Sequence, residues 1–355
     1  MLRPKLILGA AAVLLLVGIV VTAIAGGKSA GTSDVLVTHL FPYGLALDRS
    51  GNVYVTDWPN LRLVKFSPNG RLLKEWVRPG SGPRQFDQPD AVAVDPLGVI
   101  YVANTGNNYI QKLSPSGKVL AVFGGTGRAP GRFRWPSGLA LDSHHDLYVT
   151  ERLNDRIQKL SPRGKVLAIW GTYGHRPGQF DAPSAITIGP HGNMYVADDH
   201  NSRVQKLSPS GKPLAIWGQG RPPRAVFGSH ALGRGKLWHP VGLALDRFAD
   251  LFVSDSGSQS IYEFSPSGRL LAQWGGPGLA LGMLDHPHGI AVGPSMHIYV
   301  ADTFNVRVQE FSVPGKPLSL WTCRQPYVGT APAGRARCLV GTTPEFEPRP
   351  AIPGG

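Results

Sequence analysis

The sequence is poor in cysteine and in segments of helical composition. Its 355 residues include two cysteines, Cys323 and Cys338, so only one disulfide pairing is available. No long stretch rich in Ala, Glu, Lys and Leu occurs outside the N-terminus, and there is no kinase, transferase or nucleotide-binding motif. The 45 Gly and 32 Pro stay below the share expected of a low-complexity chain, and eight Trp favour a packed core. These features indicate a folded, turn-rich protein.

One uncharged run stands at the N-terminus. Residues 6–25 carry no charge and follow the basic residues Arg3 and Lys5. Twenty such residues match a membrane-spanning helix, and the basic flank predicts that everything after it lies outside the cytoplasm. The sequence Ala23-Ile24-Ala25 also fits a signal-peptidase site, so a cleaved signal would give a secreted protein. We expect residues 1–30 to be an uncleaved signal anchor because the apolar run is long. The alternative to a membrane or signal segment is a helix buried in the core.

Export bears on the two cysteines. In an oxidising compartment Cys323 and Cys338 are expected to form a structural disulfide. Both lie in the Pro-, Gly- and Arg-rich tail 322–355, which shows no repeat.

A strong internal repeat fills most of the remaining chain. Six copies each open on a proline and are spaced 47 residues apart (89 − 42 = 47), except for one spacing of 57; the openings are Pro42, Pro89, Pro136, Pro183, Pro240 and Pro287. The ten extra residues fall within 219–237.

Each copy has the pattern of four short strands. In the first copy, GLALD and NVYVTD alternate apolar and polar residues, and RLVKF and RLLKEW follow. The last two segments are joined by Ser-Pro-x-Gly, in which Pro sets φ and Gly takes the positive φ of a turn. The sequence therefore predicts an all-β fold, a six-bladed β-propeller of four-stranded antiparallel blades over 34–321. The aromatic residue that ends each copy, such as Trp76, is expected to pack between blades.

The third segment of the repeat carries a family resemblance. Residues 107–113 (NNYIQKL), 154–160 (NDRIQKL), 201–207 (NSRVQKL) and 305–311 (NVRVQEF) resemble the N-x-R-[IV]-Q-x-[LF] signature of NHL repeats. The resemblance covers 42–321 and implies a propeller. The fifth copy departs from it, with Ser258, Gln259 and Ser260 in place of the signature residues, and the first copy lacks the Gln.

One further segment, 34–40 (DVLVTHL), also has the pattern of a strand. We expect it to join the last blade beside, or in competition with, residues 317–321, and so to tie the ring together.

The residues that follow the opening prolines are expected to ring the mouth of the central channel on one face, the top face, which also carries the loops between blades. They are Tyr43, Asp90, Ser137, Ser184, Val241 and His288. The repeat is also similar to that of peptidyl-α-hydroxyglycine amidating lyase, a resemblance that implies zinc-binding histidines around the channel. Only His288 fills such a position, so the resemblance implies the fold without that three-histidine site.

Two alternatives for metal remain open. His239 and His286 occupy equivalent positions (286 − 239 = 47) close to His288, and three imidazoles could bind zinc or act in a metal-dependent lyase or hydrolase with Tyr43 or Asp90. The acids that close the second strands (Asp57, Glu151, Asp198, Asp255 and Asp302, with Asn104 in the second copy) could hold calcium, although capping of the following turn is the expected role.

The net charge of +13 indicates anionic partners. One Lys or Arg follows each bottom turn, and a second basic set lies in the top loops, so we count Arg134, Arg152 and Arg203 with the channel ring as binding residues. The leading hypothesis is a non-enzymatic, extracytoplasmic binding or sensor propeller without a cofactor, which recognises protein, peptide or an anionic polymer on its top face. Nucleic acid is not an expected partner outside the cytoplasm, and the membrane is contacted through the N-terminal helix.

Overall fold

The structure is a computed structural model that describes residues 40–219, 234–324 and 337–341. All of these residues lie in one unit formed by residues 37–355. Its regular structure is β-strand apart from two short 3-10 helices, η2 (Pro190–Gly192) and η3 (Asp199–Asn201). Within the described ranges no helix is long and apolar enough to cross a membrane. The predicted N-terminal segment 1–30 lies outside them.

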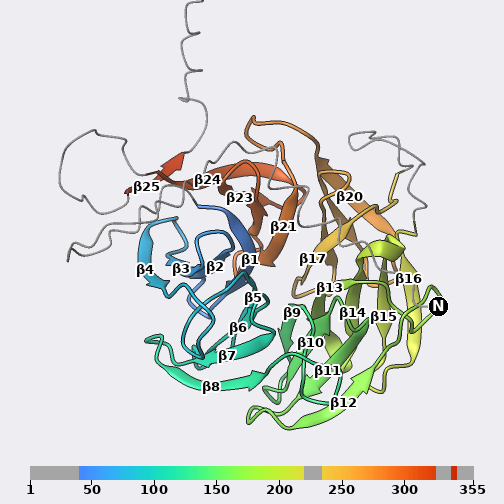
Figure 1. Cartoon of the computed structure of the whole chain (residues 1–355). Helices are drawn as coiled ribbons and strands as arrows, with labels where there is room; N and C mark the ends of the chain where they lie inside the picture. The colour runs from blue at the N-terminus through green and yellow to red at the C-terminus, as the bar shows by residue number, and fades with distance from the viewer. Residues whose placement is uncertain (1–39, 220–233, 325–336, 342–355) are drawn as a thin grey trace, which may run out of the picture. The chain divides into compact units, whose positions relative to one another are not determined.

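Six antiparallel sheets of consecutive strands form the blades of a propeller (Figure 1), which confirms the predicted fold class. Blades 1 and 2 contain β1 (Pro42–Leu47), β2 (Val53–Asp57), β3 (Arg62–Phe66), β4 (Leu72–Val77), β5 (Pro89–Val94), β6 (Ile100–Asn104), β7 (Tyr109–Leu113) and β8 (Val119–Gly124). Blades 3 and 4 contain β9 (Pro136–Leu141), β10 (Leu147–Glu151), β11 (Arg156–Leu160), β12 (Val166–Trp170), β13 (Pro183–Ile188), β14 (Met194–Asp198), β15 (Arg203–Leu207) and β16 (Pro213–Trp217). Blades 5 and 6 contain β17 (Pro240–Leu245), β18 (Leu251–Asp255), β19 (Ser260–Phe264), β20 (Leu270–Gly275), β21 (Pro287–Val292), β22 (Ile298–Asp302), β23 (Arg307–Ser312), β24 (Lys316–Arg324) and β25 (Arg337–Gly341).

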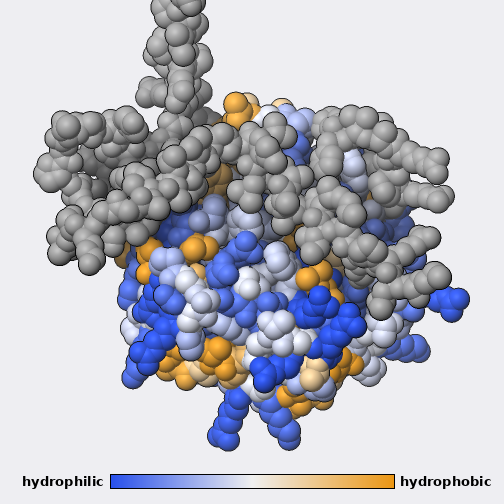
Figure 2. Space-filling model, in the orientation of Figure 1, coloured by the Kyte–Doolittle hydropathy of each residue, from blue (hydrophilic) through white to orange (hydrophobic). Residues whose placement is uncertain are grey.

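The first strand of every blade lies innermost, where it contacts the first strands of both neighbouring blades. The second strands are buried along their whole length because a neighbouring blade covers each face. The fourth strands are half exposed. Leu120 and Leu167 on β8 and β12 are 51% and 46% exposed, and apolar groups lie over these strands at the lower edge of Figure 2.

The opening Pro-x-Gly allows the first strands to approach one another closely. A Cβ built on Gly44 would lie 2.4 Å from the carbonyl oxygen of Asp90, and one on Gly242 would lie 2.2 Å from that of His288. Backbone atoms cannot yield to such a contact, so glycine is required at these two positions, whereas blades 2 and 4 carry Ala91 and Ala185 at the equivalent position.

The aromatic residue at the end of each blade packs against the next blade, as predicted. Trp76 of blade 1 lies on Gly117, the last residue of the Ser-Pro-x-Gly turn of blade 2, and Trp170 lies on Gly211 of blade 4 in the same way. Each indole also donates a hydrogen bond to that turn, from Trp76 Nε1 to the Ser116 carbonyl (3.3 Å) and from Trp170 Nε1 to the Ser210 carbonyl (3.0 Å).

The edge of the last blade differs from the prediction. The strand beside β24 is β25, from the tail that was expected to be outside the propeller. Residues 34–39 lie outside the described ranges, and Leu40 is fully buried in the core between blades 6 and 1. A strand hydrogen-bonds equally well to any chain that reaches its edge, so the strand-like pattern of 34–40 could not predict this pairing.

The pairing of β24 with β25 sets Cys323 directly opposite Cys338. Facing residues of an antiparallel pair have Cα atoms about 4.5–5.5 Å apart, within the range that a disulfide spans. The register is therefore compatible with the predicted disulfide.

Candidate functional site

The top face of the propeller is built from two sets of loops that lie side by side. The connector between two blades runs along the loop between the second and third strands of the blade it enters. In blade 2 the amides of Thr105 and Gly106 donate to the carbonyls of Gln88 (3.2 Å) and Asp87 (3.0 Å). An apolar residue anchors each connector, for example Phe86, Phe133 and Phe180, which are at most 1% exposed.

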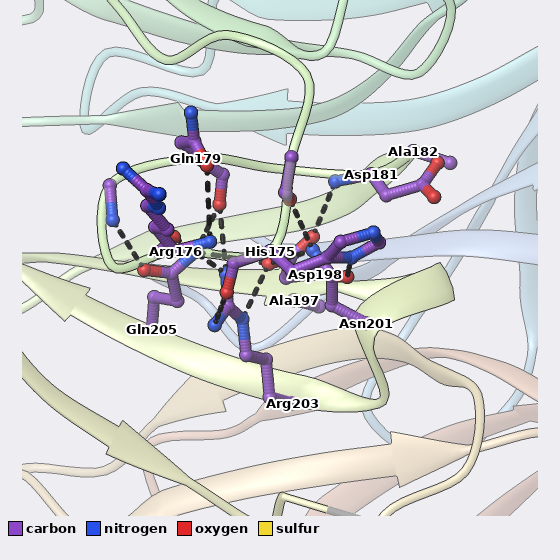
Figure 3. Close-up of polar contacts among 12 residues, drawn as sticks. His175, Arg176, Gln179, Asp181, Ala182, Ala197, Asp198, Asn201, Arg203 and Gln205 are labelled. Carbon is purple, nitrogen blue, oxygen red and sulfur yellow. Dashed lines mark hydrogen bonds and ion pairs between the residues drawn. The ribbon is translucent and has the colours of Figure 1, made fainter. Parts of the chain in front are cut away.

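A clamp of signature side chains holds the connectors to blades 3, 4 and 6, as Figure 3 shows for blade 4. In blade 4, the Asp198 carboxylate accepts hydrogen bonds from the Asp181 amide (2.8 Å), Asn201 Nδ2 (2.9 Å), Arg203 Nε (2.7 Å) and Gln205 Nε2 (3.0 Å). The Arg203 guanidinium donates in turn to the carbonyls at 175, 176 and 179 of the connector, at 2.7 to 3.0 Å. The NHL-type residues are thus explained by their hydrogen bonds to backbone amides and carbonyls of the connector, which would otherwise lack partners.

The clamp assigns a structural role to two sets of predicted residues. The strand-closing acids accept hydrogen bonds from the following turn, as expected, through Asn201 and Asn305, and they also bond connector amides, which was not predicted. Burial raises the pKa of Asp198 and Asp302. Arg203 is 1% exposed and all its hydrogen bonds are made inside the blade, so the prediction that it belongs to a binding surface was wrong. Sequence reasoning counted its charge and could not see that the loop encloses it.

Blade 5 lacks the arginine of the clamp. Ser260 takes the arginine position, and the connector that enters this blade is ten residues longer in the sequence. Asp255 is satisfied instead by the amides of Trp238 (2.6 Å), His239 (3.2 Å) and Ser258 (2.9 Å).

A cavity of about 90 Å³ lies at the mouth of the central channel. All six residues predicted to ring the mouth line it, namely Tyr43, Asp90, Ser137, Ser184, Val241 and His288, and Arg152 joins them. The pairing of the first and second strands shifts register just after each opening proline, as between Pro42 and Leu45, at the point where the ring residues line the cavity.

Arg152 begins a chain of charged groups across three blades. Its guanidinium donates to Asp199 Oδ2 (2.6 Å), and Asp199 Oδ1 lies 2.8 Å from His239 Nδ1. Burial alone would raise the pKa of Asp199, but Arg152 and His239 hold it well below its usual range. Burial would lower the pKa of His239, and the hydrogen bond and charge of Asp199 raise it instead.

Asp90 is the other charged group of the mouth, and it is 6% exposed. Among the described residues, none makes a hydrogen bond or ion pair with its carboxylate. Burial raises the pKa of Asp90 to about 7, against the opposing charge of Arg152.

An aromatic pair forms the adjacent wall of the mouth. The rings of Tyr43 and His288 lie 4.1 Å apart between centroids. Burial raises the pKa of Tyr43 and lowers that of His288 to about 4, so both rings are neutral near pH 7. His288 Nδ1 lies 3.0 Å from the His286 carbonyl and 3.2 Å from Thr303 Oγ1.

The two serines of the ring connect neighbouring blades. Ser137 Oγ donates to the Pro183 carbonyl (3.2 Å) and Ser184 Oγ to the Pro240 carbonyl (2.9 Å). Thr303 Oγ1 makes the same bond to the Pro42 carbonyl (2.7 Å) where the last blade meets the first. These hydroxyls are engaged in holding the ring together.

The three histidines of the alternative metal site have separate partners. His239 contacts Asp199, His286 Nδ1 lies 2.6 Å from Asp285 Oδ1, and His288 packs on Tyr43. Within the part of the chain that the structure describes, no group of three His, Cys, Asp or Glu side chains is arranged to hold a metal ion.

Sequence reasoning missed a second ring of residues. The position after each strand-closing acid repeats with the blades and holds Trp58, Thr105, Arg152, Asp199, Ser256 and Thr303. Only Arg152 was singled out there, whereas Asp199 and Thr303 make the contacts described above. The spacing that revealed the first ring would have revealed this one too.

Exposed arginines surround the mouth on the connectors. Arg84, Arg128 and Arg176 are exposed, and Arg134 is half-buried. The described parts of the connectors carry three acids, Asp87, Asp181 and Asp285, none of them fully exposed. The connectors that enter blades 2 to 4 therefore give the top face a basic rim.

Comparison with known proteins agrees with this architecture. The NHL repeat family model matches residues 86–113 and 284–311, and no curated protein matches the sequence. A streptogramin B lyase structure aligns with a TM-score of 0.57 at 19% identity, over 81% of this chain and 92% of that one. A catalytically inactive virginiamycin B lyase from Staphylococcus aureus, solved with quinupristin, gives 0.56 at 16% identity over 84% and 95%.

A third structure with this fold is described as a binding protein. It is an auxiliary nutrient binding protein from Bacteroides ovatus, with a TM-score of 0.56 at 14% identity over 77% of this chain and 69% of that one. At these identities the likeness shows the fold alone, and lyases and a binding protein share it. The chain therefore carries NHL repeats on a six-bladed β-propeller of four-stranded blades.

Proposed function

We propose that the chain is a non-enzymatic binding or sensor propeller, placed outside the cytoplasm, that recognises protein, peptide or an anionic polymer on its top face. The observation that supports it best is the basic rim, in which Arg84, Arg128 and Arg176 stand exposed on connectors anchored to the blades. Loops held in this way present charges without a large ordering cost on binding. The apolar run 6–25 behind Arg3 and Lys5 supports membrane attachment, and that location makes nucleic acid an unexpected partner.

Two triple variants with the same change in charge test the proposal. Arg84→Gln/Arg128→Gln/Arg176→Gln removes three charges from the top rim, and Arg71→Gln/Lys118→Gln/Lys165→Gln removes three exposed charges from the bottom turns. The probe is fluorescent heparin, titrated into the full chain in detergent micelles at about 0.1 M salt. We expect the top variant to weaken heparin binding roughly tenfold. The dependence of its affinity on salt should also be flatter, because fewer ionic contacts release fewer counterions on binding. Equal losses in both variants would mean that only net charge acts, and would overturn the proposal.

A metal-dependent lyase or hydrolase at the channel mouth is the second candidate. The grouping of Tyr43, Asp90 and His288 around one cavity, each with a shifted pKa, favours it. Two of the structural neighbours are described as lyases. Zinc or calcium in purified protein, measured by elemental analysis, would favour this candidate over the first.

A further inference from the structure

We propose that the channel mouth binds a primary ammonium group, with the Asp90 carboxylate as its counter-ion and the Tyr43 ring as one wall. This site is separate from the basic rim and does not depend on polymer binding there.

Asp90 is a buried carboxylate that faces the cavity without a hydrogen-bond partner among the described residues. It sits on β5, one residue after the opening proline, and lines the cavity of about 90 Å³. Asp90 is more than nine-tenths buried, and no described residue donates a hydrogen bond to its carboxylate. A buried carboxylate without a partner is costly to keep ionised, so a cation that enters the cavity relieves that cost.

The nearby arginine does not take this part. Arg152 lines the same cavity, but its guanidinium is bonded to Asp199, which is shared with His239. The charge of Arg152 acts on Asp90 across the cavity and partly opposes the rise of its pKa, but no ion pair or hydrogen bond joins the two side chains. A ligand cation could therefore make the direct contact that the Asp90 carboxylate lacks.

The walls of the cavity decide what kind of cation fits. Tyr43 and His288 line it with neutral rings that pack on each other. Besides Asp90, the charged residue of the lining is Arg152, which is bonded to Asp199. Small or aliphatic residues such as Ala91, Val241 and Gly242 also line the cavity. An ammonium group on a short alkyl chain suits this lining, because its charge can meet Asp90 and its chain the apolar groups.

Three probes of similar size and different charge test the site in the full chain by calorimetry: butylammonium, butyrate and 1-pentanol. We expect butylammonium to bind, and Asp90→Asn to weaken that binding at least tenfold. The proposal is overturned if butyrate or pentanol binds as tightly as the amine, or if Asp90→Asn binds the amine as tightly as the wild type does.

The pH dependence gives a second readout. Only ionised Asp90 pairs with an ammonium, and its pKa of about 7 predicts that affinity rises roughly tenfold between pH 6 and pH 8. The other charged or titratable groups near it are Tyr43, Arg152, Asp199, His239 and His288. Of these only His239 is raised towards this range, so the rise must persist in His239→Gln. An affinity that is flat with pH in both proteins would contradict the role of Asp90.

Folding and binding can be told apart in the same variant. Burial raises the pKa of Asp90 in the native state to about 7, against about 4 in the unfolded chain. The carboxyl therefore lowers the stability of the fold as pH rises from about 4 through about 7. Asp90→Asn should therefore match the wild type in thermal midpoint near pH 4 and exceed it at pH 8, while it loses the amine. Heparin binding to the rim should be unchanged in this variant, so failure here and failure of the rim proposal remain distinct.

Discussion

At the scale of the residue, one amino acid has three different roles in this protein. Arg203 is enclosed by the connector it clamps, Arg152 lies in the channel bonded to Asp199, and Arg128 is exposed on the rim. All three look alike in the sequence as single positive charges. Their roles follow from how many carbonyl and carboxylate oxygens the fold brings within reach of each guanidinium.

The clamp can be tested by a conservative substitution. Arg203→Lys keeps the charge but cannot reach Asp198 and three connector carbonyls at once, so it should lower the free energy of unfolding by about 2–4 kcal/mol. Chemical denaturation followed by Trp fluorescence measures the loss. Arg163→Lys, at an exposed arginine of a bottom turn, is the matched control and should stay within about 0.5 kcal/mol. A stable Arg203→Lys would show that the simultaneous contacts of the guanidinium with the connector carbonyls are dispensable.

At the scale of the element, the Ser-Pro-x-Gly turn serves two needs at once. It closes the outer hairpin of its own blade, and it offers a flat surface to the aromatic residue of the previous blade. Gly117 has φ +87°, and a Cβ there would overlap the Trp76 ring. Local turn chemistry alone predicted the glycine, whereas the aromatic contact needed the position of the neighbouring blade.

Two glycine substitutions separate these needs. Gly98→Ala suffers mainly from its φ of +79°, since the contact of its Cβ with Pro115 Cγ at 3.3 Å needs a shift of only a few tenths of an ångström, and it should cost about 1–2 kcal/mol. Gly117→Ala adds displacement of Trp76 and should cost about 2–4 kcal/mol, with a shift of the Trp emission. The thermal midpoints of the two variants give the comparison. Equal midpoints would mean that the indole yields without cost.

At the scale of the whole molecule, the ring closes by packing of blade 1 on blade 6. Within the described ranges each blade consists of consecutive strands, and no strand from the start of the chain joins the last blade. The Thr303 bond to the Pro42 carbonyl and the core around Trp321 and Leu40 join the two ends. β25 then covers the outer edge of the last blade.

The tail gives a prediction at this scale. We expect Cys323 and Cys338, opposite each other in register, to be disulfide-bonded in protein taken from an oxidising compartment. Alkylation under denaturing conditions should then add no group before reduction and two groups after it, as read by mass spectrometry. Closing a loop of this length is worth about 3 kcal/mol to the β24–β25 hairpin. Alkylation of both cysteines without reduction would show that they are free thiols and that no disulfide forms.

The sequence alone determined the fold, the number of blades and the ring of residues at the channel mouth. It could do so because each depends on local patterns that repeat at a fixed spacing: strand alternation, turn residues and the opening Pro-x-Gly. Tertiary structure decided which charges are free. Whether Arg203 is clamped, Asp90 left without a partner, or three histidines kept apart depends on atoms brought together from distant blades. It also decided which strand covers the last blade, since any chain segment of suitable pattern can satisfy an open edge.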